Sequence, residues 1–193
     1  MQKQFATALT ITAIILLLQG CAAAVVGGAA ATASIAHDRR TTGVIVEDQS
    51  IELKAYDLMS KDPTFKAQGS IHVTSYNMVV LLTGQAENDA LRVKAEQLVS
   101  GIDRVRRVVN EIELGSTASI GEVSRDVTLT SEVKIRLAGI KIPDFDPLRV
   151  KVVTERGTVF LMGLITKAEG DAVTDVVRHV SGVRRVVRVF EYL

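Results

Sequence analysis

The stretch Val180-Ser181-Gly182-Val183-Arg184-Arg185-Val186 near the C-terminus repeats Val99-Ser100-Gly101-Ile102-Asp103-Arg104-Val105, with the two central glycines 81 residues apart. A second pair of segments shows the same repeat. Val79-Val80-Leu81-Leu82-Thr83-Gly84 corresponds to Thr158-Val159-Phe160-Leu161-Met162-Gly163, with the glycines 79 residues apart. A loop between these landmarks can absorb the difference in spacing. The chain is therefore predicted to contain two copies of one small domain.

Each copy begins with a predicted helix and a hairpin. Apolar residues at four-residue spacing indicate the helix, through Ile51, Ala55 and Met59 in copy one and Leu129, Val133 and Leu137 in copy two. Two runs rich in β-branched residues follow, and they predict a hairpin. Its tight turn contains Asn77 in copy one and Gly157 in copy two, residue types that adopt positive φ at low cost.

A second helix and a last strand complete each copy. We expect the helix over Asp89 to Ser100 and over Glu169 to Ser181, with Gly101 and Gly182 as left-handed C-caps. The last strand should alternate between two faces. The order α-β-β-α-β, present twice, predicts an α/β fold class in the form of two α+β sandwiches. Each sandwich has a three-stranded sheet and two helices.

The N-terminal region ends in Leu18-Gln19-Gly20-Cys21, which contains the only cysteine. One positive charge, Lys3, precedes 14 uncharged and mostly apolar residues from Phe5 to Leu18. This segment is shorter than the roughly 20 residues of a membrane-spanning helix, which favours a cleaved signal peptide over an anchor helix. The site resembles the lipobox of bacterial lipoproteins. That resemblance implies that Cys21 receives a diacylglyceryl group, becomes the first residue and is then acylated with a fatty acid such as palmitate.

Composition argues against several classes of function. Cleavage before Cys21 removes Lys3 and leaves 22 basic and 22 acidic residues, so no net charge attracts nucleic acid. Trp is absent and aromatic residues make up 4% of the chain, which argues against base-stacking and carbohydrate-clamping surfaces. An exported chain with one cysteine cannot close an internal disulfide.

The two copies resemble BON domains, whose marks are the hairpin ending in glycine, the helix after it and the closing V-x-G-V-x-x-V pattern. With the lipobox, the chain is similar to the dual-BON outer-membrane lipoproteins of Gram-negative bacteria, the YraP or DolP type. The resemblance implies phospholipid binding at the inner face of the outer membrane, a part in envelope integrity and association with the division site. Ala22, in place of Asp, fits delivery to the outer membrane.

These observations predict five segments: a lipoprotein signal peptide (1–20), a lipidated Ala/Gly-rich tether (21–45), BON domain 1 (46–114), a linker (115–123) and BON domain 2 (124–193). The small side chains and Gly27-Gly28 favour a flexible tether. A helix lying in the membrane interface is the alternative for this segment.

The first helix of copy two, about Asp126 to Ala138, carries a candidate lipid-binding face. Ile135 lies about 200° around the helix from Val133 and so falls outside the core stripe. The predicted phospholipid-binding residues are Val127, Thr128, Ser131, Lys134, Ile135 and Ala138. Related proteins can place a large aromatic residue near the start of this helix, where this chain has Val127-Thr128, so we expect shallow insertion. The alternative is that this face packs against the other BON domain.

The other polar clusters have either a structural interpretation or two interpretations that stay open. The arginines near the last strands either bind phosphate headgroups or keep an exposed strand edge solvated: Arg104, Arg106, Arg107, Arg184, Arg185 and Arg188. Asp144-Phe145-Asp146-Pro147 is interpreted as an acidic turn rather than a metal site. The three histidines lack ligand spacing. We therefore expect no metal site, no catalytic residue and no cofactor.

The sequence thus predicts a non-enzymatic lipoprotein of the cell outer membrane, lipid-anchored through Cys21 on the periplasmic face. Its expected partner is an anionic phospholipid membrane, not nucleic acid, and this binding is expected to support envelope integrity and cell division. The rival hypothesis is a periplasmic adaptor whose partners are outer-membrane assembly proteins, division proteins or regulators of cell-wall hydrolases.

Overall fold

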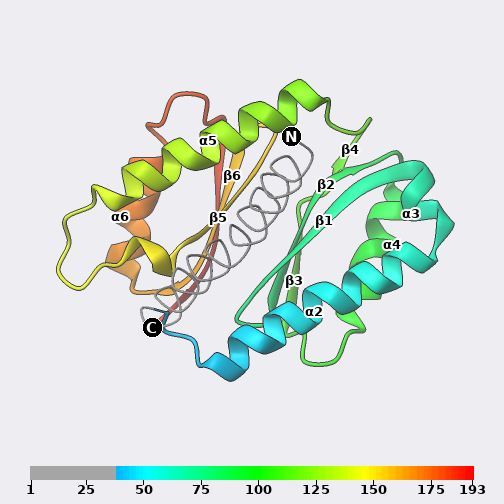
Figure 1. Ribbon diagram of the computed structural model, residues 1–193, viewed down its shortest axis with the longest axis horizontal. Helices are drawn as coiled ribbons and strands as arrows, with labels where there is room; N and C mark the ends of the chain where they lie inside the picture. The colour runs from blue at the N-terminus through cyan, green and yellow to red at the C-terminus, as the bar shows by residue number, and fades with distance from the viewer. Residues whose placement is uncertain (1–37) are drawn as a thin grey trace, which may run out of the picture. The chain divides into compact units, whose positions relative to one another are not determined.

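The computed structural model describes residues 38–193, which contain two copies of one fold (Figure 1). The first copy comprises α2 (Thr42–Lys61), α3 (Pro63–Gln68), β1 (Gly69–Tyr76), β2 (Val79–Ala86), α4 (Asp89–Ser100), β3 (Arg107–Asn110) and β4 (Glu113–Leu114). The second comprises α5 (Ile120–Ala138), the 3-10 helix η1 (Pro147–Arg149), β5 (Lys151–Glu155), β6 (Thr158–Ile165), α6 (Lys167–Val177) and β7 (Arg185–Tyr192). Cys21 and the predicted tether up to residue 37 lie outside the described residues.

The two sheets share one topology. β2 pairs antiparallel with β1 and parallel with β3, and β6 pairs antiparallel with β5 and parallel with β7. β4 continues the line of β3 along β2, so these two segments act as one interrupted strand. The predicted α/β fold class and α-β-β-α-β order are confirmed. The first copy adds α3 between its first helix and its hairpin.

The predicted helix Asp89–Ser100 with its cap at Gly101 is confirmed, but the left-handed conformation of that cap and the predicted end of the corresponding helix in copy two were wrong. Gly101 has φ −80°, a right-handed value, because a bond from the Ile102 N–H to the Val99 carbonyl (3.1 Å) tightens the helix end. α6 ends at Val177, well before Gly182, whose φ of +93° belongs to the next loop.

Helix caps lie inside both predicted connecting segments, so the first helix of each domain begins earlier than predicted. α5 begins at Ile120, within the predicted linker, since Ser119 and Glu122 form a capping box. α2 begins at Thr42, within the predicted tether, and the Thr41 side chain caps it by accepting the Val44 N–H.

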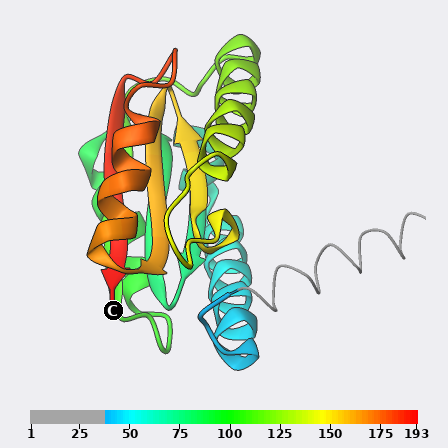
Figure 2. The ribbon, with the colours of Figure 1, turned by 90° about the vertical axis from the view of Figure 1, so that its left-hand side faces the viewer.

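Each domain has an apolar core between its helices and the inner face of its sheet. In the first domain α2 contributes Ile51, Ala55 and Met59, and β2 contributes Val80 and Leu82. In the second, α5 contributes Leu129, Val133 and Leu137, and β6 contributes Val159 and Leu161. Figure 2 shows α6 lying over the strands of the second sheet, on the side away from the first domain. The helical core stripes predicted from spacing are confirmed.

The two sheets pack against each other through their opposite faces, and residues 39–193 form one unit. The third core at this seam contains Tyr76, Val79, Leu81, Phe160, Met162 and Val189. Polar contacts surround it, such as the 2.7 Å hydrogen bond from the Gln85 amide to Glu155. The order of layers is helices, sheet, sheet, helices. The outer sides of α2 and α5 are therefore left uncovered by the other domain.

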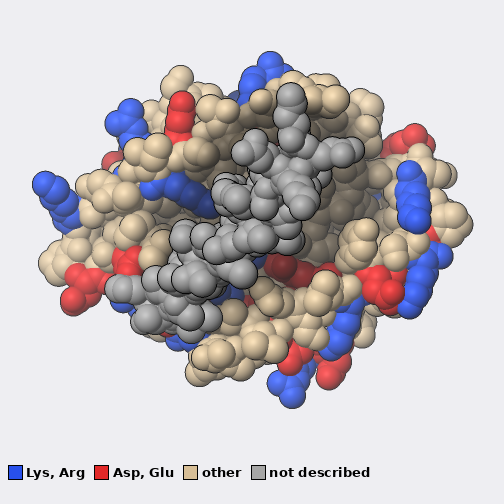
Figure 3. All heavy atoms as spheres, viewed as in Figure 1, with Lys and Arg blue, Asp and Glu red and all other residues tan. Residues whose placement is uncertain are grey.

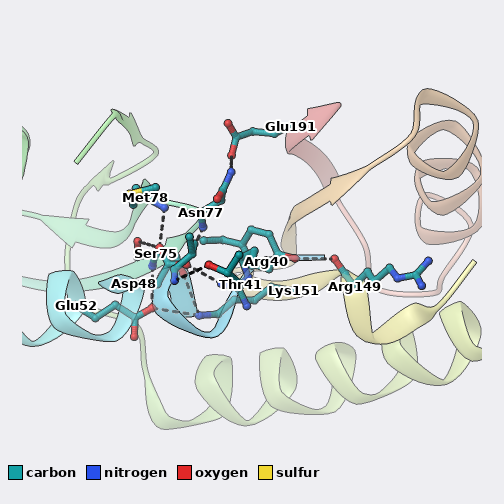
Figure 4. A network of polar contacts seen from close by, with 12 residues as sticks. Arg40, Thr41, Asp48, Glu52, Ser75, Asn77, Met78, Arg149, Lys151 and Glu191 are labelled. Carbon is teal, nitrogen blue, oxygen red and sulfur yellow. Dashed lines mark hydrogen bonds and ion pairs between the residues drawn. The ribbon is translucent and has the colours of Figure 1, made fainter. Parts of the chain in front are cut away.

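In the first domain, Asp48 of α2 holds the turn between β1 and β2 (Figure 4). Its carboxylate accepts hydrogen bonds from the N–H groups of Asn77 (2.8 Å) and Met78 (2.7 Å), and both residues have positive φ. Asp48 is 3% exposed and forms a 2.7 Å ion pair with Arg40. The Arg40 guanidinium in turn lies 3.6 Å from the centre of the Tyr76 ring. One carboxylate thus satisfies the donors of a two-residue turn.

Asp126 of α5 has the corresponding role in the second domain. It accepts hydrogen bonds from the N–H groups of Arg156 (2.6 Å) and Gly157 (2.9 Å). The predicted turn position of Gly157 is confirmed by its φ of +75°. The sequence analysis missed both aspartates. Their shared place, one turn before the first core residue of each first helix, was the available signal.

Arg39 attaches the start of the described chain to the second domain. Its guanidinium donates to both carboxylate oxygens of Glu169, at 2.7 and 3.0 Å, and to the Leu164 carbonyl at 3.2 Å. Burial alone would raise the pKa of Glu169, but hydrogen bonds from Arg39 and Thr166 outweigh it and hold that pKa below its usual value. Because Arg40 binds the first domain, these consecutive arginines contact both domains.

Candidate functional site

The predicted lipid-binding residues lie on α5, which is fixed firmly to its sheet. The helix starts at its capping box and buries the stripe Leu129, Val133 and Leu137. The Thr130 hydroxyl also bonds to the Thr154 hydroxyl of β5 at 2.8 Å. Because one side of α5 is held in this way, the opposite side is directed away from the domain.

All six predicted residues are exposed on that opposite side: Val127, Thr128, Ser131, Lys134, Ile135 and Ala138. Ile135 is 70% exposed and Val127 63% exposed, large fractions for apolar side chains. The alternative that this face packs on the other BON domain is wrong, because the domains meet through their sheets.

Two further residues extend this surface, and the sequence analysis missed them. Ile120 is 91% exposed and Val123 is 51% exposed. At 100° per residue, Ile120, Val123 and Val127 fall within about 60° of one another. Ile120 and Val123 both fall in the predicted linker (115–123), because the capping box at Ser119 was overlooked. We call the combined surface the α5 outer face: Ile120, Val123, Val127, Thr128, Ser131, Lys134, Ile135 and Ala138.

The polar groups of the α5 outer face are few and mostly satisfied. The hydroxyls of Thr128 and Ser131 donate to the carbonyls of Ser124 (3.1 Å) and Val127 (3.0 Å) within the helix. Lys134 is the only charged residue of the face and forms no ion pair within residues 38–193. Moving this surface out of water therefore leaves few hydrogen-bond donors without an acceptor. Its chemistry suits an apolar surface that carries negative charge.

The basic residues near the last strands do not form a free patch. Four of the six predicted arginines are in ion pairs: Arg104 with Glu47, Arg106 with Glu191, Arg185 with Glu111 and Arg188 with Asp171. Two of these pairs, at 2.9 and 2.8 Å, join the two domains. On the face shown in Figure 3, basic and acidic side chains are interspersed around the periphery. The arrangement favours a structural role for these arginines over a phosphate site.

The remaining polar candidates are local structural features. Asp146 caps η1 by accepting the Leu148 N–H at 2.8 Å, as expected for an acidic turn. Within residues 38–193, no cluster of three His, Cys, Asp or Glu side chains could hold a metal ion. In the same residues, none of the helices combines the length and apolarity needed to cross a bilayer.

Comparison with known proteins agrees with the fold and the repeat. The BON domain family matches residues 47–116 and 125–193. Outer membrane lipoprotein DolP of Haemophilus influenzae is 39% identical over 91% of this chain and 90% of that protein. The 21 kDa hemolysin of Actinobacillus pleuropneumoniae is 35% identical, covering 81% of this chain and 79% of that protein. Osmotically-inducible protein Y of Escherichia coli is 28% identical, covering 75% and 72%. This chain therefore belongs to the BON-domain family, as an outer-membrane lipoprotein of the DolP type with two BON domains.

Proposed function

We propose that this protein is non-enzymatic, is attached to the outer membrane through acylated Cys21, and binds anionic phospholipid through the α5 outer face. This binding supports envelope integrity and cell division. The observation that carries the proposal is the face itself, on which four large apolar side chains are exposed beside Lys134, which has no ion pair within residues 38–193. A lysine near an anionic membrane contributes on the order of 1 kcal/mol, and the exposed apolar side chains add to it.

The lipid anchor makes a weak protein–lipid contact sufficient. Acyl chains on Cys21 already hold the protein at a bilayer, so α5 meets lipid at a high effective concentration. The contact then selects the lipid environment and the orientation of the two domains. An α5 outer face of modest apolar area fits this division of roles.

Vesicle co-sedimentation of the mature chain carrying Cys21→Ser, which lacks the acyl chains, tests the lipid contact. We expect binding to vesicles that contain phosphatidylglycerol and little binding to phosphatidylcholine alone. Ile135→Glu should weaken binding roughly tenfold or more, because it adds a negative charge and removes apolar area. No binding to any vesicle composition would contradict the proposal.

Leu53→Glu is a matched control for this substitution. Leu53 lies on α2 and is 69% exposed, almost the same fraction as Ile135. Both variants introduce the same charge on an exposed helix, so a difference between them reports location rather than net charge. Equal weakening by both would show that binding follows bulk electrostatics and not the α5 outer face.

The anchor is tested separately in cells. Cys21→Ser in the full precursor should move the protein from the membrane to the soluble periplasmic fraction. Membrane association that persists when Ile135→Glu is added to Cys21→Ser would show that the leader remains as an anchor helix. The double variant is needed because the α5 outer face can itself contact lipid.

A further inference from the structure

β1 lies at an edge of the first sheet and is unlike the other sheet edges. It is eight residues long and contains no Asp, Glu, Lys or Arg. The other edge strands carry charge: Arg107 in β3, Lys151 and Glu155 in β5, and Arg185, Arg188 and Glu191 in β7. Proteins usually protect an exposed edge with charges, proline or a covering segment, because its backbone can pair with another strand. β1 lacks the charge protection that the other edges have.

The hairpin turn determines which backbone groups of β1 face this edge. Asn77-Met78 forms a two-residue turn with positive φ at both positions, which makes Tyr76 and Val79 a hydrogen-bonded pair. Pairing alternates along an antiparallel ladder, so every second residue from Ser75 back to Ile71 turns its N–H and C=O away from β2.

Within the part of the chain that the structure describes, contacts occupy one end of this edge. Glu52 accepts the outward Ser75 N–H at 2.8 Å, and the Lys151 ammonium lies 3.5 Å from the Ser75 carbonyl (Figure 4). The outward backbone groups of Val73 and Ile71 have no partner within residues 38–193. The free part of the edge is therefore short and lies toward the start of β1.

An apolar groove runs beside the free part of the edge. An open cavity of about 370 Å³ is lined by α2, α3 and β1, with Met59 and Phe65 in its wall and Tyr56 at its rim. Tyr56 is 74% exposed. A second cavity, of about 230 Å³, opens on the other side of β1 and shares Ser70 and His72 with the first. The edge is thus accessible from both faces of the sheet.

The charge in the groove identifies the kind of partner. Lys66 is the only Lys, Arg, Asp or Glu residue that lines the cavity beside α2, and it forms no ion pair within the described residues. It lies just before β1, at the free end of the edge. A chain added antiparallel to β1 ends at this same place, so its terminal carboxylate meets the Lys66 ammonium.

We infer that β1 binds the extended C-terminal tail of another envelope protein as an additional antiparallel strand. The tail pairs with the backbone of Ile71 and Val73, places an apolar side chain in the groove and pairs its carboxylate with Lys66. Backbone pairing supplies affinity, and the groove and the lysine supply selectivity, as in other cases of strand addition. This site borders the α5 outer face, because Val123 and Val127 of α5 line the second cavity.

A synthetic pentapeptide, Thr-Val-Thr-Val-Phe with a free carboxylate, tests the inference on the mature lipidated protein in detergent micelles. At millimolar peptide, we expect the backbone amide resonances of Ile71 and Val73 to shift in NMR spectra. Amidation of the peptide C-terminus should weaken binding roughly tenfold, because it removes a charge-assisted contact. Methylation of the peptide nitrogens that face β1 should abolish binding, whereas methylation of the alternate nitrogens should not.

Variants of the protein locate the contact. Lys66→Glu should reproduce the effect of amidation, and Lys54→Glu is the control, because Lys54 is exposed on α2 and does not line the groove. Both replace surface side chains, and circular dichroism checks that both fold. Absent shifts on β1, equal binding of acid and amide peptides, or no effect of Lys66→Glu would overturn the inference. Self-association that Lys66→Glu abolishes would also overturn it, by showing that a second copy occupies the edge.

Discussion

α2 and α5 occupy the same place in the two domains, yet their outer sides carry different chemistry. When the core positions are aligned, Tyr56-Asp57 of α2 stands where α5 has Lys134-Ile135. Both helices expose large apolar side chains, among them Val46, Leu53 and Tyr56 on α2, but Asp57 and its ion-pair partner Lys61 place charge on α2 where α5 has Ile135. The core stripe must fit the sheet in both domains, whereas the outer side is free to diverge. The comparison therefore separates residues that make the fold from residues that give one copy its surface.

The same comparison applies to the aspartates that hold the hairpin turns. Asp48 is almost completely buried and is paired with Arg40. Asp126 is partly exposed and has no ion pair within residues 38–193. Both accept two turn N–H groups, but only Asp48 also neutralises a largely buried cation.

The largest expected effect comes from replacing these two equivalent aspartates with alanine. Asp48→Ala should lower the free energy of unfolding by about 3–5 kcal/mol, because it removes the 2.7 Å ion pair with the largely buried Arg40 together with the acceptor of both turn N–H groups. Asp126→Ala should lower it by about 1–3 kcal/mol, because it leaves only turn N–H groups without their acceptor. Urea unfolding of the mature Cys21→Ser chain, followed by far-ultraviolet circular dichroism, measures both values. Equal losses would mean that the Arg40 ion pair contributes nothing to the difference.

Local signals made most of the fold predictable. The core stripes follow from apolar residues at helical spacing, and the turn at Gly157 follows from its tolerance of positive φ. The packing of sheet against sheet was not predictable in this way. β2 and β6 are apolar on both faces, and a continuous apolar run does not say which domain covers Leu81 or Phe160. The buried arginine partner of Asp48 depends on that same three-dimensional arrangement.

Only part of the candidate site was predictable from the sequence, and that part follows from the local geometry of the α5 helix. The exposed position of Ile135 follows from helix geometry once Leu129 and Val133 are placed in the core. Ile120 and Val123 were missed because a Ser/Thr-rich stretch before them was interpreted as linker, although Ser119 and Glu122 have capping-box spacing. The β1 groove was not visible in the sequence, because α3 and the edge of β1 meet only in the folded domain.

A smaller effect, on vesicle binding, is expected from giving α2 the apolar residue that α5 has at the equivalent position. In the Ile135→Glu background, Asp57→Ile should raise binding to phosphatidylglycerol vesicles roughly tenfold, because it removes a repelled charge and adds apolar area. The lost surface ion pair with Lys61 should affect stability little. Co-sedimentation measures the gain, and Asp57→Asn, which removes only the charge, should show a smaller one. No gain from Asp57→Ile would mean that the α5 outer face depends on more than its apolar pattern.

The smallest effect concerns a contact that only the first domain has, at the junction of α2 and α3. Hydrogen bonds from Lys94 and from the Thr64 side chain and N–H lower the pKa of Asp62 from 3.8 to about 2. The contribution of this carboxylate to stability is therefore complete above about pH 3.8 and is lost as the pH falls through about 2. Carboxyl carbon shifts in an NMR titration measure this pKa directly.

Lys94→Ala removes the first of these partners and should move the pKa of Asp62 back toward 3.8. The second domain has no α3 and so has no counterpart to this contact. Lys94→Ala should accordingly leave the α5 outer face and its vesicle binding unchanged. If Asp62 titrates near 3.8 in the unmodified protein, neither the ion pair with Lys94 nor the hydrogen bonds from Thr64 hold in solution. The junction of α2 and α3 would then rest on the packing of Phe65.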